Sequence, residues 1–528
     1  MKILNLNTVL KDNPYQIKKV VLGEKETTIT DFIAVVKYAA VIEFDDTYGL
    51  RVKKSFNDLN RALNKKKKIY GVNTGLGDNW MKEVDDNEQN KLQKNILSSH
   101  AVSVGKPISY FETRAIMLMT LINLGKGYSG VSLETLEEIK DVLNAKIYPF
   151  APGEGSVGYL SVEAHIFRAL IGEGKVFVDK QLKNSREILL EKGIKIPTLK
   201  RKEGLALISG TMSVTAIALL AVYNIYSELK HIEVGAAMSF EGLQGSLAEL
   251  NSTVMNLKVH EEQFETAQNV KNILAGSKNL EKNEGLKLQD ALSIRTLPQT
   301  IGALIRVFKE TLKTVYEEMI SVSDNPVFIT ENDKLNVYMN GNFDASYVAL
   351  HMDYLVIAVT NFVNTIERIT NRFLDTKLSG LPPFLVKSPG VNNGLMIVHY
   401  TMTGLLNEMK LLASPVNINN NTMSAEQEDV VTFAFLASKK AYLMSEKFKE
   451  VMAIWFFVCK EGVSFLNIEE LAPMIKKVTL IIEKSVPKVV KDRAFYEDIG
   501  NLKKLMSQGT IIEQVEKDMG PIKINLNL

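Results

Sequence analysis

The sequence predicts an all-α protein of long helices with a few short strands, and two observations support this. Between Ser346 and Leu374, apolar residues recur at steps of three and four, as on the buried face of a helix. Strand-like patterns are few and short, at Lys175–Val178 and at Val327–Tyr338, where Asn332 and Asp333 predict a turn. The fold class is therefore a helix bundle with minor strands.

The same helical periodicity predicts the other long elements in chain order. Four further ranges carry it: Ser213–Leu250, Leu304–Val322, Gly394–Leu412 and Val430–Phe457. A boundary near Thr198–Gly204 is expected to separate an N-terminal portion, residues 1–200, from a long-helix bundle and C-terminal helical region, residues 201–528.

Composition excludes several function classes. The 528 residues include 63 basic and 61 acidic side chains, so no overall field favours nucleic acid or an anionic membrane. The single cysteine, Cys459, cannot form an intramolecular disulfide, and no secretory or membrane-anchoring segment is recognised, so a cytoplasmic setting is expected. The six histidines lack short ligand spacing, which argues against a metal site.

Turns rich in glycine and asparagine interrupt the helices beside polar residues, and we expect them to meet at one site. They lie at Gly71–Gly77, Pro149–Gly158, Asn340–Asn342 and Pro415–Asn421. The first follows Tyr70 in the run Tyr-Gly-Val-Asn-Thr-Gly-Leu-Gly.

Together with their flanks, these motifs resemble the histidine and aromatic amino acid ammonia-lyase family over nearly the whole chain. The resemblance implies Tyr70 and Glu428 as catalytic residues, with Tyr70 as the base. It also implies that His100, after Ser99, and Glu428 hold an imidazole-type ring. A phenol has a pKa of about 10 in water, so this base needs neighbours that stabilise its anion, and backbone amides of the glycine-rich run are candidates.

Further matches imply how the rest of the substrate is bound. Arg295 corresponds to the family arginine that holds the substrate carboxylate through a bidentate fork, and Gln289 would support it. The turn Asn-Gly-Asn-Phe implies that Asn342 and Phe343 lie at the substrate. His399 is either a site residue or a packed interface histidine, and the sequence leaves both open.

The departures from the family lie at the amine end of the expected pocket. Members carry Ala-Ser-Gly after Gly-Ser-Val-Gly, and this tripeptide cyclises into the electrophile methylidene-imidazolone (MIO); here Gly158 is followed directly by Tyr159. Ser209 stands where the family has asparagine, Met212 where it has glutamine, and Leu292 where it has tyrosine. We therefore expect no MIO and no other cofactor.

These departures suit a substrate whose nitrogen is already a leaving group. MIO bonds to the lone pair of an amino group, and a trimethylated nitrogen has none, whereas aromatic faces such as Phe343 and Tyr159 can hold its charge. The chain thus resembles the MIO-less ergothionase branch of the family, which eliminates trimethylamine from ergothioneine to give thiourocanate. Two alternatives stay open: a histidine ammonia-lyase and a catalytically silent homologue. The family resemblance also implies a homotetramer with sites shared between subunits.

Overall fold

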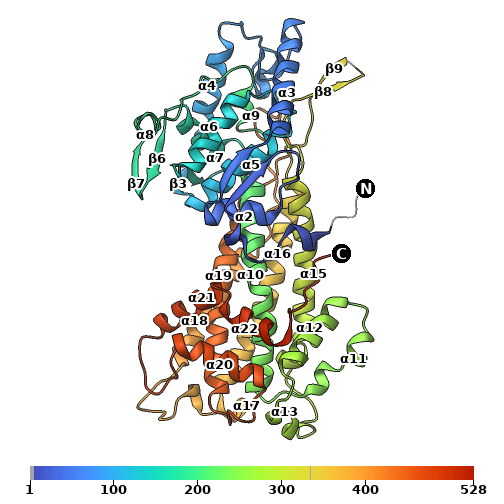
Figure 1. Cartoon of the computed structure of the whole chain (residues 1–528), viewed down its shortest axis with the longest axis vertical. Helices are drawn as coiled ribbons and strands as arrows, with labels where there is room; N and C mark the ends of the chain where they lie inside the picture. The colour runs from blue at the N-terminus through green and yellow to red at the C-terminus, as the bar shows by residue number, and fades with distance from the viewer. Residues whose placement is uncertain (1–4, 333) are drawn as a thin grey trace. The chain divides into compact units, whose positions relative to one another are not determined.

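The computed structural model describes residues 5–332 and 334–528, so Asp333 of the predicted turn lies outside the described residues. Helices dominate and strands are few and short (Figure 1), which confirms the predicted fold class. Contacts divide the chain into two compact units. Unit 1 comprises the residues up to Leu220, Thr311–Asp353 and Pro415–Lys440; unit 2 comprises Ala221–Glu310, Tyr354–Ser414 and Ala441–Leu528. Each unit is discontinuous in sequence, and the boundary expected near residues 198–204 stays a prediction.

Most helices of unit 1 are short or of medium length. They are α1 (Leu6–Val9), η1 (Pro14–Gln16), α2 (Ile29–Tyr38), α3 (Asp46–Asn64), η2 (Gly77–Met81), α4 (Gln89–His100), α5 (Tyr110–Leu124), α6 (Leu133–Asn144), α7 (Ser161–Leu170), α8 (Ser185–Glu191) and α9 (Glu203–Ala206). Unit 2 contains η3 (Leu247–Leu250), α11 (Ser252–Asn256), α12 (Glu261–Ile273), α13 (Lys278–Asn283), α14 (Leu292–Arg295), α17 (Thr376–Ser379), η4 (Pro383–Leu385), α18 (Met396–Leu412), α20 (Pro473–Ser485), α21 (Phe495–Ser507) and α22 (Thr510–Met519).

Four long helices contribute residues to both units: α10 (Met212–Gly242), α15 (Leu297–Met319), α16 (Ser346–Leu374) and α19 (Ala434–Val463). The predicted bounds of α16 are confirmed. By contrast, α10 ends at Gly242 instead of continuing to Leu250, because the chain turns through a second glycine, Gly245, before η3. α15 begins earlier than predicted, since its Pro298 falls in the first turn, where no intrahelical N–H is needed.

The strands form small separate sheets within unit 1. β8 (Val327–Glu331) pairs antiparallel with β9 (Lys334–Tyr338), and β6 (Lys175–Val178) is also present, so both predicted strand regions are confirmed. The sequence missed the parallel pair β1 (Lys19–Leu22) and β2 (Val41–Phe44), and also β3 (Val104–Pro107), β4 (Tyr148–Pro149), β5 (Pro152–Glu154) and β7 (Gln181–Asn184). Such short strands carry too few alternating positions to give a signal.

Two helices, α10 and α16, are long and apolar enough to cross a membrane by length and composition alone. Within the structure, 83% of the apolar window of α10 and 56% of that of α16 are buried. Core helices of globular proteins meet the same criterion, so this is weak evidence for a membrane span.

Candidate active site

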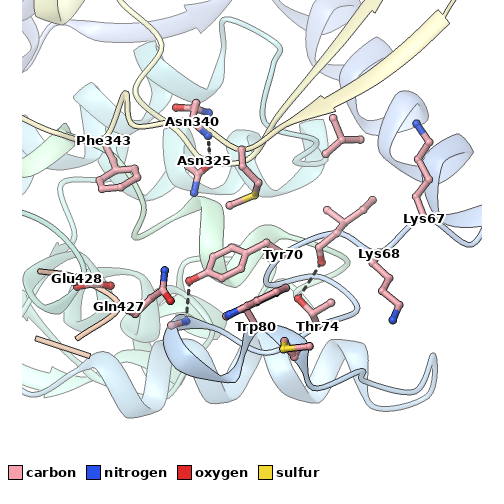
Figure 2. A pocket seen from close by; sticks show the side chains of 15 residues that line it. Lys67, Lys68, Tyr70, Thr74, Trp80, Asn325, Asn340, Phe343, Gln427 and Glu428 are labelled. Atoms are coloured by element: carbon pink, nitrogen blue, oxygen red, sulfur yellow. Dashed lines mark hydrogen bonds between the residues drawn. The ribbon is translucent and has the colours of Figure 1, made fainter. Parts of the chain in front are cut away.

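Tyr70 lies in a turn whose neighbouring side chains are fixed in the core of unit 1. Ile69 and Val72 are 1% and 0% exposed and pack in one cluster with Leu59 and Phe328. Full burial of an aliphatic side chain contributes roughly 1.5–3 kcal/mol, so the cluster holds the backbone on both sides of Tyr70. The ring itself is left among the side chains that line a cavity (Figure 2).

The Tyr70 hydroxyl accepts a hydrogen bond from the backbone N–H of Gly77 at 2.8 Å. Gly77 has a φ of 53°, and a Cβ there would lie 2.5 Å from Ser424 Oγ, so only glycine fits this position. Burial raises the pKa of Tyr70; the Gly77 N–H opposes this increase, and the carboxylate of Glu428 adds to it. A backbone amide of the glycine-rich run therefore stabilises the Tyr70 anion, as expected, but burial raises the pKa by more than this hydrogen bond lowers it.

Two adjoining cavities of unit 1 share Tyr70, Gly77, Asn325, Phe343 and Glu428. The inner pocket, of about 560 Å³, is lined by those five residues and by Gly75, Leu76, Asn79, Leu92, Asn95, Ile96, Ser99, His100, Tyr159, Leu160, Leu205, Ser209 and Ser424. The outer pocket, of about 720 Å³, adds Lys67, Lys68, Ile69, Thr74, Trp80, Met81, Val337, Met339, Asn340 and Gln427. Figure 2 shows the Tyr70 ring among the residues of the outer pocket, with its hydroxyl on the side of Gln427 and Glu428.

The inner pocket brings together six of the candidate residues: Tyr70, His100, Tyr159, Ser209, Phe343 and Glu428. These come from segments far apart in the sequence. The expectation that the glycine- and asparagine-rich turns meet at one site is confirmed for three of them, the turns that flank Tyr70, Tyr159 and Phe343.

His100 closes the C-terminal end of α4 with a defined ring orientation. Its Nδ1 lies 2.8 Å from the carbonyl oxygen of Ile96 and 3.1 Å from Ser99 Oγ. Because a carbonyl can only accept, Nδ1 carries the hydrogen, and Nε2 of the neutral ring is left with a lone pair. His100 can therefore accept a hydrogen bond from an azole N–H.

Glu428 is presented by a tight turn. Ser424, Ala425 and Glu426 have φ values of 52°, 52° and 67°, in the left-handed region that non-glycine residues rarely occupy. Reciprocal backbone hydrogen bonds between Met423 and Glu428, at 2.8 and 3.2 Å, close the turn. Backbone strain of this kind is concentrated at functional sites.

One wall of the inner pocket is formed directly after the junction of Gly158 and Tyr159. The Tyr159 ring meets the Phe343 ring edge-on, with centroids 5.7 Å apart. Leu160 has a φ of 79°, and its N–H donates to the Ile208 carbonyl at 3.1 Å. Burial, and then the carboxylates of Glu428 and Asp344, raise the pKa of Tyr159 to about 12, so it is a neutral phenol.

Asn325 is a pocket residue that sequence reasoning missed. It lines both cavities, and its Oδ1 accepts the backbone N–H of Asn340 at 2.9 Å. The preceding Asp324 forms a fully buried ion pair with Lys202 at 2.5 Å. Asn342 does not line either cavity; its Nδ2 donates to the Val322 carbonyl at 3.2 Å and so supports the turn before Phe343.

Other candidates belong to unit 2 and line neither cavity. Arg295 donates a hydrogen bond to Gln289 Oε1. Leu292, which lies between these two residues in the sequence, is 64% exposed. His399 Nε2 lies 2.6 Å from Glu367 Oε1. Burial alone would raise the pKa of Glu367, but the hydrogen bonds from His399 and Arg368 lower it to about 2. The roles assigned to Arg295, Gln289 and His399 stay predictions.

Comparison with known proteins places this geometry in context. The family model "Aromatic amino acid lyase" matches residues 27–484. The chain belongs to the aromatic amino acid lyase family. It is 33% identical over 504 residues to histidine ammonia-lyase of Alkaliphilus oremlandii, covering 95% of this chain and 99% of that one. It is 32% identical over 513 residues to histidine ammonia-lyase 1 of Fusobacterium nucleatum, with 96% and 99% covered.

Solved structures of the family share the fold. Histidine ammonia-lyase from Trypanosoma cruzi superposes with a TM-score of 0.89 at 29% identity, covering 97% of this chain and 98% of that one. Ergothionase, the ergothioneine-degrading enzyme of Treponema denticola, superposes with a TM-score of 0.86 at 24% identity, covering 94% and 99%, which shows a shared fold alone.

The MIO group of this family does not fit the residues present. Gly158 is joined directly to Tyr159, without an Ala-Ser-Gly between them. The Leu160 N–H at this junction is bonded to Ile208, and the Tyr159 ring occupies the pocket wall.

Proposed function

We propose that the protein is a carbon–nitrogen lyase that eliminates trimethylamine from the betaine of an imidazole amino acid, such as ergothioneine or hercynine, without MIO. Family membership supports a lyase acting beside an aromatic ring. The substrate assignment rests on the inner pocket and on the junction between Gly158 and Tyr159.

The observation that carries the proposal is the charge of the inner pocket. Among its described lining residues there is a carboxylate, Glu428, and no lysine or arginine. Aromatic rings of Tyr70, Tyr159 and Phe343 line the same space. A quaternary ammonium group has no N–H to donate, so aromatic faces and a nearby carboxylate are the groups suited to hold it, with cation–π contacts of roughly 0.5–2 kcal/mol each.

The departures at the amine end support the same substrate. A trimethylated nitrogen carries no lone pair for an electrophile and leaves as a neutral amine, so neither MIO nor a proton donor is needed. Ser209 and Met212 replace the asparagine and glutamine found in members with MIO, and Met212 is fully buried.

The proposed elimination uses residues of the pocket in separate roles. Tyr70, as phenolate, takes a proton from the carbon beside the ring, and the released electron pair forms the new carbon–carbon double bond as the carbon–nitrogen bond breaks. Nε2 of His100 accepts the azole N–H and orients the ring together with Glu428, whose carboxylate also attracts the cationic nitrogen. Arg295 would bind the carboxylate through both of its terminal nitrogens.

We propose a homotetramer with shared sites. Arg295 and Gln289, which are expected to bind the substrate carboxylate, lie in unit 2 and are not among the described residues that line either cavity. Exposed apolar side chains follow one face of α16 at steps of three and four, as expected of a helix covered by another copy: Tyr347, Leu350, Tyr354 and Ile357. We propose that another subunit supplies Arg295 to the inner pocket, in a cytoplasmic homotetramer.

A second candidate is the release of ammonia from histidine. It is favoured by the names of the sequence relatives, which include histidine ammonia-lyases that are 31–35% identical to this chain. Against this candidate, the amino group of histidine would have no electrophile to activate it as a leaving group. A catalytically silent homologue is the third possibility, and the retained Tyr70 loop and Arg295 argue against it.

One product assay separates the three. Purified protein is incubated separately with ergothioneine, hercynine and histidine, and trimethylamine, ammonia and the ultraviolet absorbance of the conjugated acrylate are measured. The proposal expects trimethylamine from at least one betaine and no ammonia from histidine. Ammonia from histidine would instead establish the second candidate, and no turnover of any substrate would support the third.

A further inference from the structure

The base of the inner pocket has a poor environment for ionisation while the pocket is empty. The Tyr70 hydroxyl has one stabilising contact, the Gly77 N–H at 2.8 Å, and it faces the carboxylate of Glu428. Burial and that carboxylate both raise the pKa of Tyr70 above its ordinary value near 10. At neutral pH the group is therefore a phenol and cannot accept the proton.

The other charged groups around Tyr70 do not correct this. His100, on α4, keeps Nε2 as an acceptor when neutral, and Tyr159 is a phenol. In the outer pocket, Lys67 Nζ donates to the Leu335 carbonyl at 3.2 Å, and Lys68 pairs with Glu83. Asp344, before α16, adds further negative potential at Tyr159. Among the described residues that line the inner pocket, no lysine or arginine lies beside Glu428. An Arg295 supplied by another subunit would be paired with the substrate carboxylate, so a positive charge beside Glu428 is still needed.

We propose that the substrate supplies this charge: its quaternary ammonium group binds beside Glu428 and increases the fraction of Tyr70 that is phenolate, so the substrate activates the base that attacks it. This inference rests on the proposed function. A unit positive charge about 5 Å from the hydroxyl, at an effective dielectric constant of about 20, lowers the pKa of Tyr70 and increases the phenolate fraction about a hundredfold.

The protons balance over one turnover. On binding, the Tyr70 proton passes to solvent and the phenolate remains beside the cation. The phenolate then takes the proton from the carbon beside the ring, which restores the phenol while the carbon–nitrogen bond breaks. Trimethylamine leaves as a neutral base and takes up one proton from water. Ionisation of Tyr70 in the reactive complex therefore releases one proton, and product release consumes one.

The coupling also discriminates between kinds of nitrogen. A primary ammonium, as in histidine, can neutralise itself by giving a proton to the Tyr70 phenolate or to Glu428, and the positive charge is then lost. A quaternary nitrogen has no proton to give. Only the betaine keeps both the charge and the ionised base in place until the carbon–hydrogen bond breaks.

The test is an ultraviolet difference titration for tyrosinate on the full-length protein at constant pH. The probe is glycine betaine, which has a quaternary nitrogen but no hydrogen that this elimination could remove. The matched control is 3,3-dimethylbutanoate, which has the same shape and carboxylate with carbon in place of the charged nitrogen. Proton release into a weakly buffered solution is recorded in parallel.

The expected result is a saturable tyrosinate band and release of up to one proton per site with glycine betaine, and neither with the control. The band should be absent in Tyr70→Phe and retained in Tyr159→Phe, which removes the neighbouring phenol. Failure of glycine betaine to bind, an equal band with both probes, or a band that survives Tyr70→Phe would overturn the inference.

Its failure is distinguishable from failure of the proposed function. Release of trimethylamine from a betaine without any tyrosinate band on probe binding would leave the function standing and remove the coupling. A Tyr70-dependent band without turnover of any betaine would leave the coupling standing and remove the function.

Discussion

The inner pocket of unit 1 and the segment 286–295 of unit 2 both carry residues that the sequence assigned to the substrate, yet they differ in completeness. The pocket gathers Tyr70, His100 and Glu428 around one cavity. The segment holds Arg295 against Gln289, and its Leu286 and Leu288 are 73% and 104% exposed. Neither Arg295 nor Gln289 is among the described residues that line the pocket, and the proposal of a shared site assigns them to another copy of the chain.

The largest effect is expected in the inner pocket, on substitution of Tyr70. Tyr70→Phe removes the proton acceptor and keeps the ring packing, so kcat with the preferred betaine should fall about 10²- to 10⁴-fold, the usual contribution of general base catalysis. Substrate affinity, measured by equilibrium binding, should change little. Retention of wild-type kcat would show that another group is the base.

Substitution of Arg295 tests the role of the segment 286–295. Arg295→Lys keeps the charge but loses the bidentate fork, and KM should rise about 10- to 100-fold because charge-assisted hydrogen bonds contribute roughly 1.5–3 kcal/mol. Steady-state kinetics with the substrate and with an analogue that lacks its carboxylate should show that the increase in KM depends on that group. An unchanged KM would place Arg295 outside the site.

Mixed oligomers of the two inactive variants test directly whether a site is shared between subunits. Chains carrying Tyr70→Phe and chains carrying Arg295→Ala should each be nearly inactive alone. When they are co-assembled at random in equal amounts, about one quarter of shared sites receive both intact residues, so activity should return to about that fraction. No recovery in verified mixed oligomers would mean that both residues come from the same chain.

A buried acid on α7, the helix that follows Tyr159, makes unit 1 sensitive to pH. Glu163 on α7 is fully buried, and burial raises its pKa to about 7 although it accepts the Ser213 N–H. Its unfolded pKa is about 4.3, so the folded state retains the proton longer. The stability contributed by this group is present below pH 4 and is lost as pH rises through 7.

Glu163→Gln should remove this dependence. Between pH 5 and pH 8, the free energy of unfolding of the variant relative to wild type should increase by about 2 kcal/mol, as each unit of pKa corresponds to about 1.4 kcal/mol. Urea denaturation at the two pH values measures the difference. Glu187→Gln, on the surface helix α8, is a suitable control. A parallel response in both variants would contradict the assignment.

The smallest effect is expected for Tyr159, the ring proposed to contact the cation. Tyr159→Leu removes an aromatic face beside Phe343, and KM for the betaine should rise about 2- to 30-fold, the equivalent of a cation–π contact of 0.5–2 kcal/mol. Tyr159→Phe keeps the face and should stay near wild type. Equal losses in both variants would assign the role to the hydroxyl.

Long-range features of the fold and part of the site could be predicted from the sequence. The apolar stripe of α16 gave its bounds because 29 residues repeat one pattern, and the motifs around Tyr70, His100 and Glu428 correctly identified residues of one pocket. Asn325 and Trp80 were missed because their positions follow from how the β8–β9 hairpin and η2 pack, which no local pattern encodes. The role of Arg295 stays a prediction, since a motif identifies a residue type and not the chain whose pocket it completes.

The central claim is that the amine end of the pocket accepts a quaternary nitrogen and not a primary one. It is tested most directly by giving the wild-type protein equal concentrations of ergothioneine and histidine, then hercynine and histidine, and quantifying trimethylamine and ammonia in the same samples. We predict trimethylamine in at least one mixture, with ammonia at the level of a protein-free control. Ammonia above that control, with little or no trimethylamine, would contradict the account.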